Sequence, residues 1–74
     1  MKYRYAKEYY YTNGKKTPSS VTLFRIRPNG KFYMWKDNRW TYSGTSTFTW
    51  KDKCTTYTWY NIELTKDEIF LELL

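Results

Sequence analysis

The chain has 74 residues, which is enough for one small domain over residues 1–74. Hydrophobic residues make up 41% of it and aromatic residues 23%, which excludes a disordered tail, because disordered chains contain few aromatics. The net charge of +6 is unevenly distributed, with twelve basic and three acidic side chains in residues 1–60 but one basic and four acidic ones in residues 61–74.

The first element that the sequence predicts is a strand over residues 3–12. Four tyrosines fall on odd positions, with Lys7 between them, and Lys2, Arg4, Glu8 and Thr12 fall on even ones, an alternation typical of a half-buried strand. The tyrosines are Tyr3, Tyr5, Tyr9 and Tyr11. We expect them to face the core, and the alternative is an exposed tyrosine strip beside Lys2, Arg4 and Lys7. Asn13-Gly14 ends the strand, and a polar loop follows.

A hairpin is predicted next, with strands on both sides of Asn29-Gly30. Both central residues of a two-residue type I′ turn need a positive φ, which Asn and Gly adopt readily, so this dipeptide favours such a turn. The turn would set the register of the two strands. The expected cross-strand pairs are Arg27 with Phe32, Ile26 with Tyr33, Arg25 with Met34, and Phe24 with Trp35.

A second tight turn is predicted over residues 36–39, placing Trp35 opposite Trp40 and Tyr33 opposite Tyr42. The two turns together predict one aromatic face and one basic face. The aromatic one would hold Phe24, Ile26, Tyr33, Trp35, Trp40 and Tyr42. The basic one would hold Arg25, Arg27, Phe32, Met34, Lys36, Arg39 and Thr41.

Two further strands and a helix complete the predicted order. Phe48 and Trp50 alternate with threonines, and residues 55–64 form a long β-prone run. A helix is expected over about residues 65–74, because Thr65 and Glu68 match a capping box. Its apolar stripe would be Ile69, Phe70, Leu73 and Leu74, which must pack on the sheet or on a second copy of the chain. The predicted fold class is therefore mainly β (α+β): a four- to five-stranded antiparallel meander or small barrel with one short C-terminal helix.

The side chains needed for catalysis are scarce in this sequence, so we expect a protein that is not an enzyme. There is no histidine, and the single cysteine, Cys54, has no histidine to activate it. A small structural cysteine is the better interpretation of Cys54. Glu68 and Glu72 could share a helix face, but two carboxylates make a poor metal site. We therefore expect neither a metal nor a cofactor.

The leading functional hypothesis is nucleic-acid binding through the predicted basic face. Basic groups neutralise phosphates, and exposed aromatic rings stack on bases. The candidate residues are Arg25, Arg27, Phe32, Met34, Lys36 and Arg39, to which Lys2, Arg4 and Lys7 could add contacts. A bland alternative is that these charges only keep the sheet solvated.

Two alternatives to nucleic-acid binding stay open. One is a small phage- or mobile-element-type inhibitor or adaptor that binds an acidic surface of a host protein, in keeping with the many residues that have A/T-rich codons. The other is a homo-oligomer, formed through the helix face, that sequesters a nucleotide. With one cysteine and no long apolar run, a cytoplasmic protein without a membrane segment is expected.

Overall fold

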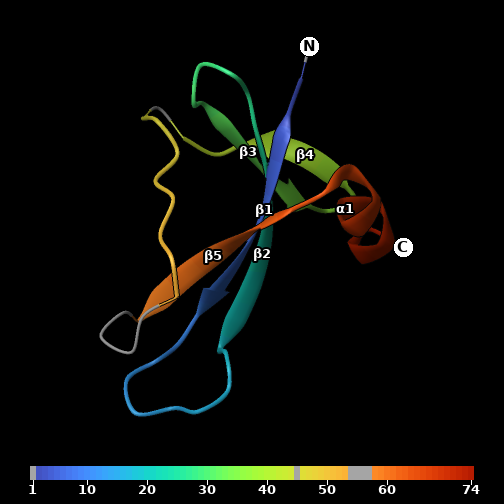
Figure 1. Ribbon diagram of the computed structural model, residues 1–74. Coiled ribbons are helices and arrows are strands. Elements are labelled where there is room, and N and C mark those ends of the chain that lie inside the picture. Colours follow the sequence, from blue (N-terminus) through green and yellow to red (C-terminus); the bar gives the residue numbers. More distant parts are fainter. Residues whose placement is uncertain (1, 45, 54–57) are drawn as a thin grey trace.

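Five antiparallel strands form one open sheet in the computed structural model, which describes residues 2–44, 46–53 and 58–74 (Figure 1). The elements are β1 (Arg4–Tyr10), β2 (Ser20–Ile26), β3 (Phe32–Lys36), β4 (Arg39–Tyr42), β5 (Trp59–Leu64) and the helix α1 (Lys66–Glu72). The strand order is β4-β3-β2-β1-β5, so β5 extends a four-stranded meander on the free side of β1. The predicted fold class is confirmed, in its open-sheet form. Within the described residues, no helix is long and apolar enough to cross a membrane.

The register of the β2–β3 hairpin differs by one residue from the predicted one. Phe24 lies opposite Met34, and Ile26 lies opposite Phe32. Because side chains alternate between the two sides of a strand, a shift of one residue moves a whole strand's side chains to the other face. The predicted division into one aromatic face and one basic face is therefore wrong.

The loop between these strands explains the shift, because it contains three residues instead of two. In a two-residue Asn29-Gly30 turn, Pro28 would have to donate a hydrogen bond to Lys31, and it has no N–H. The Arg27 N–H donates to the Lys31 carbonyl instead, at 2.9 Å. The Gly30 N–H donates back to the Arg27 carbonyl at 2.8 Å, and Gly30 adopts a φ of +89°.

The second hairpin forms as predicted. Asp37 and Asn38 both have a positive φ, of 55° and 62°, as a two-residue type I′ turn requires. The predicted pairs of Trp35 with Trp40 and of Tyr33 with Tyr42 are confirmed.

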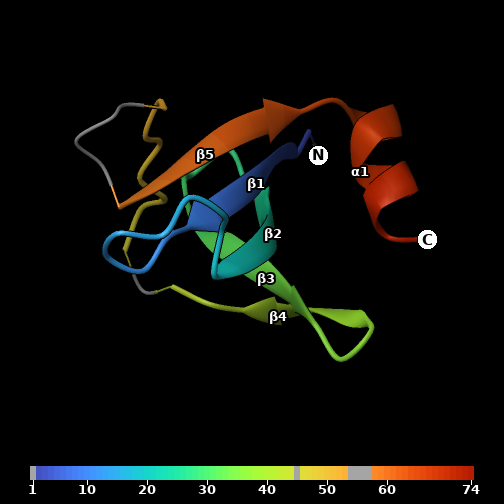
Figure 2. The same cartoon turned by 90° about the horizontal axis from the view of Figure 1, so that it is seen from below.

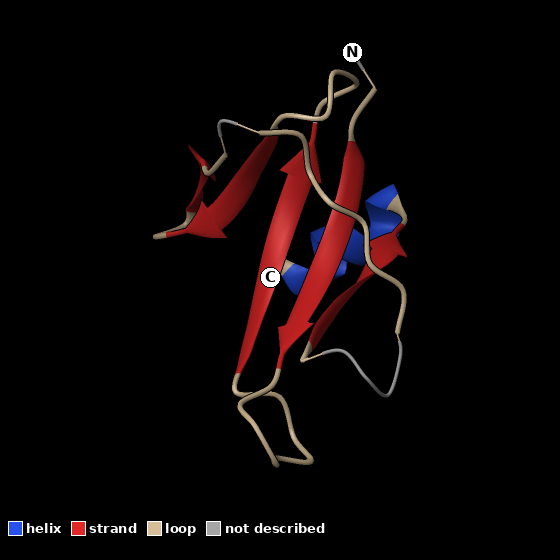
Figure 3. Cartoon of the chain, turned by 90° about the vertical axis from the view of Figure 1, so that its left-hand side faces the viewer, coloured by secondary structure: helices blue, strands red, loops and turns tan. Residues whose placement is uncertain are grey.

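One face of the sheet is covered by residues 46–53, which we call the crossing segment. Figure 3 shows it passing over one side of the strands, while α1 lies on the other side. Phe48 of this segment is buried, and its ring lies 5.2 Å from that of Phe24 and 5.1 Å from that of Phe32. The core that the segment forms with the sheet consists of Ala6, Phe24, Ile26 and Phe48, with Phe32, Met34 and Trp50 packed around them. We call this side of the sheet the covered face.

The crossing segment is held by hydrogen bonds at both of its ends: the Phe48 N–H donates to the Gly30 carbonyl at 2.6 Å, and the buried amide of Asn61 binds the residues that follow. Asn61 is only 4% exposed, and its side-chain N–H₂ donates to the Thr49 carbonyl at 3.1 Å. Its side-chain oxygen accepts from the Lys51 N–H at 3.0 Å, and its backbone N–H donates to the Lys51 carbonyl at 2.9 Å. The strand predicted around Phe48 and Trp50 is therefore wrong, because the isolated bonds that this segment makes to Gly30 and Asn61 do not continue into a sheet ladder.

The tyrosines of β1 point away from this core, which corrects their expected placement. Ala6 is fully buried, whereas Tyr5 and Tyr9 are half-buried on the opposite side of the strand. A small alanine under the crossing segment leaves room for the large rings of Phe24 and Phe48. The alternation of the sequence therefore predicts the strand correctly but assigns the wrong side to the core.

Helix α1 begins with the predicted capping box. The Glu68 N–H donates to the Thr65 hydroxyl at 3.2 Å, and the Thr65 N–H donates to the Glu68 carboxylate at 2.8 Å. Both donors would otherwise lack partners at the helix start, so the pair fixes where α1 begins.

The helix packs on β1 and β5 through Ile69 and Leu73, which are four residues apart and lie on the same side of the helix. Ile69 is 1% exposed and Leu73 is half-buried. The predicted stripe is only partly confirmed, because Phe70 and Leu74 are exposed, as is Leu71. Figure 2 shows α1 at one end of the molecule, away from the β3–β4 hairpin. Cys54 and the first residues of the predicted 55–64 strand lie outside the described residues.

We expect Gly44→Ala to destabilise the fold. A Cβ atom at Gly44 would lie 2.4 Å from the ring of Phe32, which is itself packed against the core. Overpacking of this kind costs about 1–3 kcal/mol. Urea unfolding would measure it, with the exposed neighbour Ser43→Ala as the control that should change little. Equal stabilities of the two variants would contradict this packing.

We expect Glu8→Gln to stabilise the protein at neutral pH only. Glu8 lines a cavity of about 150 Å³ with Phe24, Phe48 and Trp59, and burial raises the pKa of its carboxyl. Below the unfolded-state pKa of about 4.3 the carboxyl is protonated in both states and costs nothing. As the pH rises through the higher folded-state pKa, the ionised form disfavours folding. Unfolding at pH 7 and pH 3 checks this, and a difference that is the same at both would contradict it.

Candidate functional site

The face opposite the crossing segment carries a row of aromatic rings interrupted by one arginine. Tyr5, Arg25, Tyr33 and Tyr42 lie directly opposite one another across β1 to β4. Residues that are directly opposite project to the same side of a sheet. We call this surface the aromatic face. Its members are Tyr3, Tyr5, Arg25, Arg27, Tyr33, Trp35, Trp40 and Tyr42.

Arg25 lies at the centre of the aromatic face, surrounded by rings. Its guanidinium carbon is 4.5 Å from the ring centroid of Tyr3, 5.3 Å from that of Tyr33 and 5.2 Å from that of Trp40. The rings attract the cation through their negative faces. Its Nε is buried and makes no hydrogen bond among the described residues, so this donor has no protein partner there.

Arg27 adds a second guanidinium beside the first. Its Nη1 donates to the hydroxyl of Tyr33 at 3.2 Å. This hydrogen bond is the main reason that the pKa of Arg27 lies above its ordinary value. Tyr33 therefore contacts both arginines, one through its ring and one through its hydroxyl.

The outer strands supply the more open rings. Tyr33 and Tyr42 meet edge to face at 5.5 Å between centroids, and Trp35 and Trp40 do so at 5.1 Å. Tyr42 is 49% exposed, and the other three are half-buried. Each ring is held by a neighbour yet keeps part of its surface open to a ligand.

The strands place no carboxylate on the aromatic face. Glu8 and Glu63 are the two acidic residues of the strands. Because side chains alternate along a strand, both point to the covered face, on the same side as Ala6 and Asn61. Helix α1 covers the β1–β5 part of this face, where Lys7 forms an ion pair with Glu72 that raises the pKa of Lys7. The part over β2, β3 and β4 therefore has a positive charge and aromatic rings.

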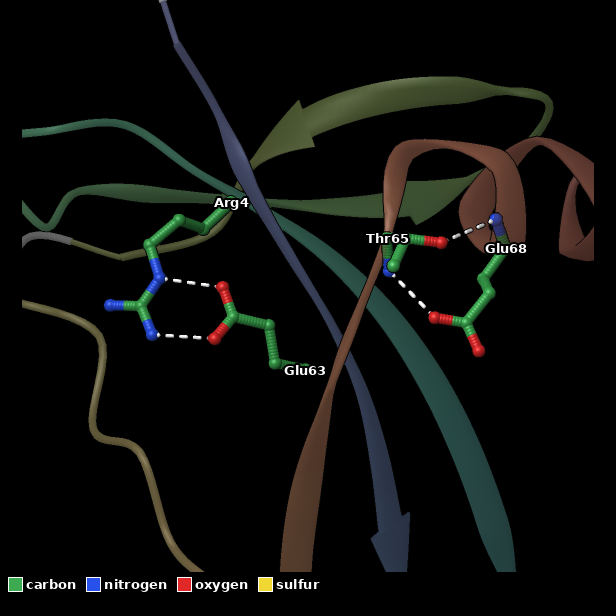
Figure 4. A network of polar contacts seen from close by, with 4 residues as sticks. All are labelled: Arg4, Glu63, Thr65 and Glu68. Carbon is green, nitrogen blue, oxygen red and sulfur yellow. Dashed lines mark hydrogen bonds and ion pairs between the residues drawn. The ribbon is translucent and has the colours of Figure 1, made fainter.

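Arg4, at the start of β1, forms a two-pronged ion pair. Its Nε and Nη2 donate to the two carboxylate oxygens of Glu63, at 2.7 and 2.8 Å (Figure 4). These hydrogen bonds lower the pKa of Glu63. The guanidinium also lies 4.2 Å from the ring centroid of Trp50 in the crossing segment. Arg4 is thus oriented and neutralised by its partners.

A separate group of tyrosines stacks at the other end of β1 and β5. The ring of Tyr60 lies 5.2 Å from that of Tyr9 and 6.0 Å from that of Tyr11. Lys53 lies 5.5 Å from the Tyr60 ring centroid. Aromatic and basic groups therefore also adjoin each other beyond the aromatic face.

The residues that the sequence predicted for the site do not share one surface. Arg25 and Arg27 belong to the aromatic face, whereas the other four lie on the covered side: Phe32, Met34, Lys36 and Arg39. Phe32 and Met34 pack on the core, so they offer no exposed stacking surface. Lys36 and Arg39 are exposed partners at the tip of the β3–β4 hairpin.

The sequence analysis placed the tyrosines and tryptophans of β3 and β4 on the face opposite the arginines, and so missed them as site residues. The signal that could have found them is Pro28, whose missing N–H excludes the two-residue turn. With a three-residue loop, Arg25 falls opposite Tyr33, and the rings join the arginines on one face.

No family model matches the sequence, and no curated protein or solved structure matches it either. In the part of the chain that the structure describes, no group of three or more His, Cys, Asp or Glu side chains could hold a metal ion. The function must therefore be argued from the geometry of the surface.

We expect Arg25→Met to leave the stability unchanged or to raise it. The cation–π contacts contribute about 0.5–2 kcal/mol. The buried Nε without a partner costs about 1–3 kcal/mol, so removal of the guanidinium is not a net loss. Urea unfolding beside Arg39→Met, an exposed control, would measure it. A decrease in stability of more than about 2 kcal/mol for Arg25→Met alone would show that the arginine is mainly structural.

Proposed function

We propose that the protein is a non-catalytic module that binds single-stranded nucleic acid through the aromatic face. The observation that supports this most is the position of Arg25. A planar cation is held among three rings, on a face to which the strands contribute no carboxylate.

The two residue types on this face match the two parts of a nucleotide. Arg25 and Arg27 would neutralise phosphates, and guanidinium groups recognise phosphate oxygens with two parallel hydrogen bonds. Tyr42 and the pair of Trp35 and Trp40 would stack on bases. Stacking of this kind is worth about 1–3 kcal/mol per base and tolerates any sequence.

A single strand suits this surface better than a duplex does. The bases of a duplex are stacked on one another, so their faces are not available to protein rings. The aromatic face is made of half-buried and exposed rings on a sheet. The helix that the structure describes, α1, packs on β1 and β5 and is not placed to enter a major groove. Binding would therefore be weakly specific and would favour unpaired nucleotides.

A protein partner with an acidic surface is the second candidate, since Tyr, Trp and Arg are also the residues that dominate protein–protein contacts. The exposed ring of Tyr42 could contact a protein partner as well as it could stack on a base. The two candidates differ in one respect: if the natural ligand were a protein, a short oligonucleotide would not compete with it for the face.

Two paired variants test the proposal. Arg25→Met with Arg27→Met removes both charges of the aromatic face, and Lys36→Met with Arg39→Met removes two charges from the covered side. We expect the first pair to weaken binding of a single-stranded oligonucleotide about tenfold or more, the effect of removing one charge-assisted hydrogen bond. The dependence of log K on log salt should flatten by about 0.7 for each phosphate that the variant no longer neutralises.

Tryptophan fluorescence reports the binding directly, because Trp35 and Trp40 lie beside the arginines. The control pair has the same net charge as the test pair, so any difference between them is due to position and not to total charge. Equal weakening by the two pairs would reject the aromatic face as the site. Absence of salt-sensitive binding in the unmodified protein would reject nucleic-acid binding itself.

A further inference from the structure

A groove of about 780 Å³ lies beside the aromatic face, where β1 begins and β5 ends. Its walls come from the residues before and at the start of β1, from the end of β5 and from the link to α1. The side chains that matter for its chemistry are Lys2, Tyr3, Arg4, Tyr5, Glu63 and Lys66. Pockets that bind small molecules have volumes of about 300–1,000 Å³, so this groove is large enough for a nucleotide.

The groove and the aromatic face are continuous. Tyr3 and Tyr5 belong to both, and the ring of Tyr3 is held in place by the guanidinium of Arg25. Tyr5 also contacts Trp40, with 6.3 Å between ring centroids. A nucleic-acid strand bound along the aromatic face would therefore reach the groove at Tyr3 and Tyr5 without leaving the protein surface.

The charge of the groove comes from two lysines. Arg4 is matched by Glu63, so this pair adds no net charge (Figure 4). Lys2 and Lys66 are both exposed and give the groove a net charge of +2. A phosphate monoester carries a charge of about −1.5 to −2 at pH 7, whereas a phosphodiester within a strand carries only one negative charge.

Local structure holds this arrangement in place. The capping box between Thr65 and Glu68 fixes the first turn of α1, and with it the backbone of Lys66 (Figure 4). The same contact ties the Glu68 carboxylate to the Thr65 N–H. The capping box thus holds the wall of the groove that Thr65 and Lys66 form.

We propose that the groove holds the terminal nucleotide of a bound strand, with its terminal phosphate monoester between Lys2 and Lys66 and its base against Tyr3 or Tyr5. This inference rests on the proposed function, since the strand reaches the groove from the aromatic face. It adds that the protein distinguishes the end of a strand from its interior.

The test compares one oligonucleotide sequence in three forms: with a 5′-phosphate, with a 3′-phosphate and with neither. We expect one of the phosphorylated forms to bind about tenfold more tightly than the form without a terminal phosphate, the effect of one charge-assisted hydrogen bond. Lys2→Gln with Lys66→Gln should abolish this preference. Lys15→Gln with Lys16→Gln, which removes two exposed charges from the loop at the far end of β1, should keep it.

The outcomes separate this inference from the function on which it rests. If all three forms bind equally and Arg25→Met with Arg27→Met still weakens them, the groove proposal fails and the aromatic face stands. The groove proposal also fails if the two lysine pairs reduce the preference equally. If no form binds, the proposed function fails, and the groove proposal fails with it.

Discussion

Pro28 lacks the amide hydrogen that a two-residue hairpin turn would need at its position. The chain therefore makes a three-residue loop in which the Arg27 N–H bonds to the Lys31 carbonyl. This loop sets the register of β2 against β3, and the register decides which side chains share a face. It sends Phe24 and Ile26 to the covered face and leaves Arg25 among the tyrosines. The core and the candidate site both follow from it.

The second requirement is that one face be covered and the other left open. A chain of 74 residues cannot bury both faces of its sheet with a helix of seven residues. The crossing segment covers one face with Phe48 and Trp50, and the buried side chain of Asn61 anchors it. Helix α1 packs on the β1–β5 part of the other face. The rings over β2 to β4 stay partly exposed, which is where the site is proposed.

Much of this fold could be predicted from local sequence signals. Alternation predicted β1, the positive-φ residues Asp37 and Asn38 lie in the predicted second turn, and the capping residues Thr65 and Glu68 start the helix. Each of these depends on neighbouring residues alone. The path of the crossing segment could not be predicted, because it depends on hydrogen bonds from Asn61, more than ten residues away from Thr49.

The candidate site was only half predictable for the same reason. Arg25 and Arg27 were identified by charge, but their aromatic neighbours depend on one missing hydrogen bond at Pro28. The strand alternation of the tyrosines was correct, yet alternation alone does not say which side a distant segment will cover. Ala6, and not a tyrosine, is the β1 residue that lies under Phe48.

The most direct test is an NMR measurement of the β2–β3 register. In an antiparallel pair, the Hα atoms of residues in non-hydrogen-bonded pairs are close enough to give strong NOEs. The three-residue loop predicts such NOEs between Ile26 and Phe32 and between Phe24 and Met34. NOEs between Arg27 and Phe32 and between Arg25 and Met34 would contradict it, because they would return the arginines to the side of Phe32 and dismantle the aromatic face.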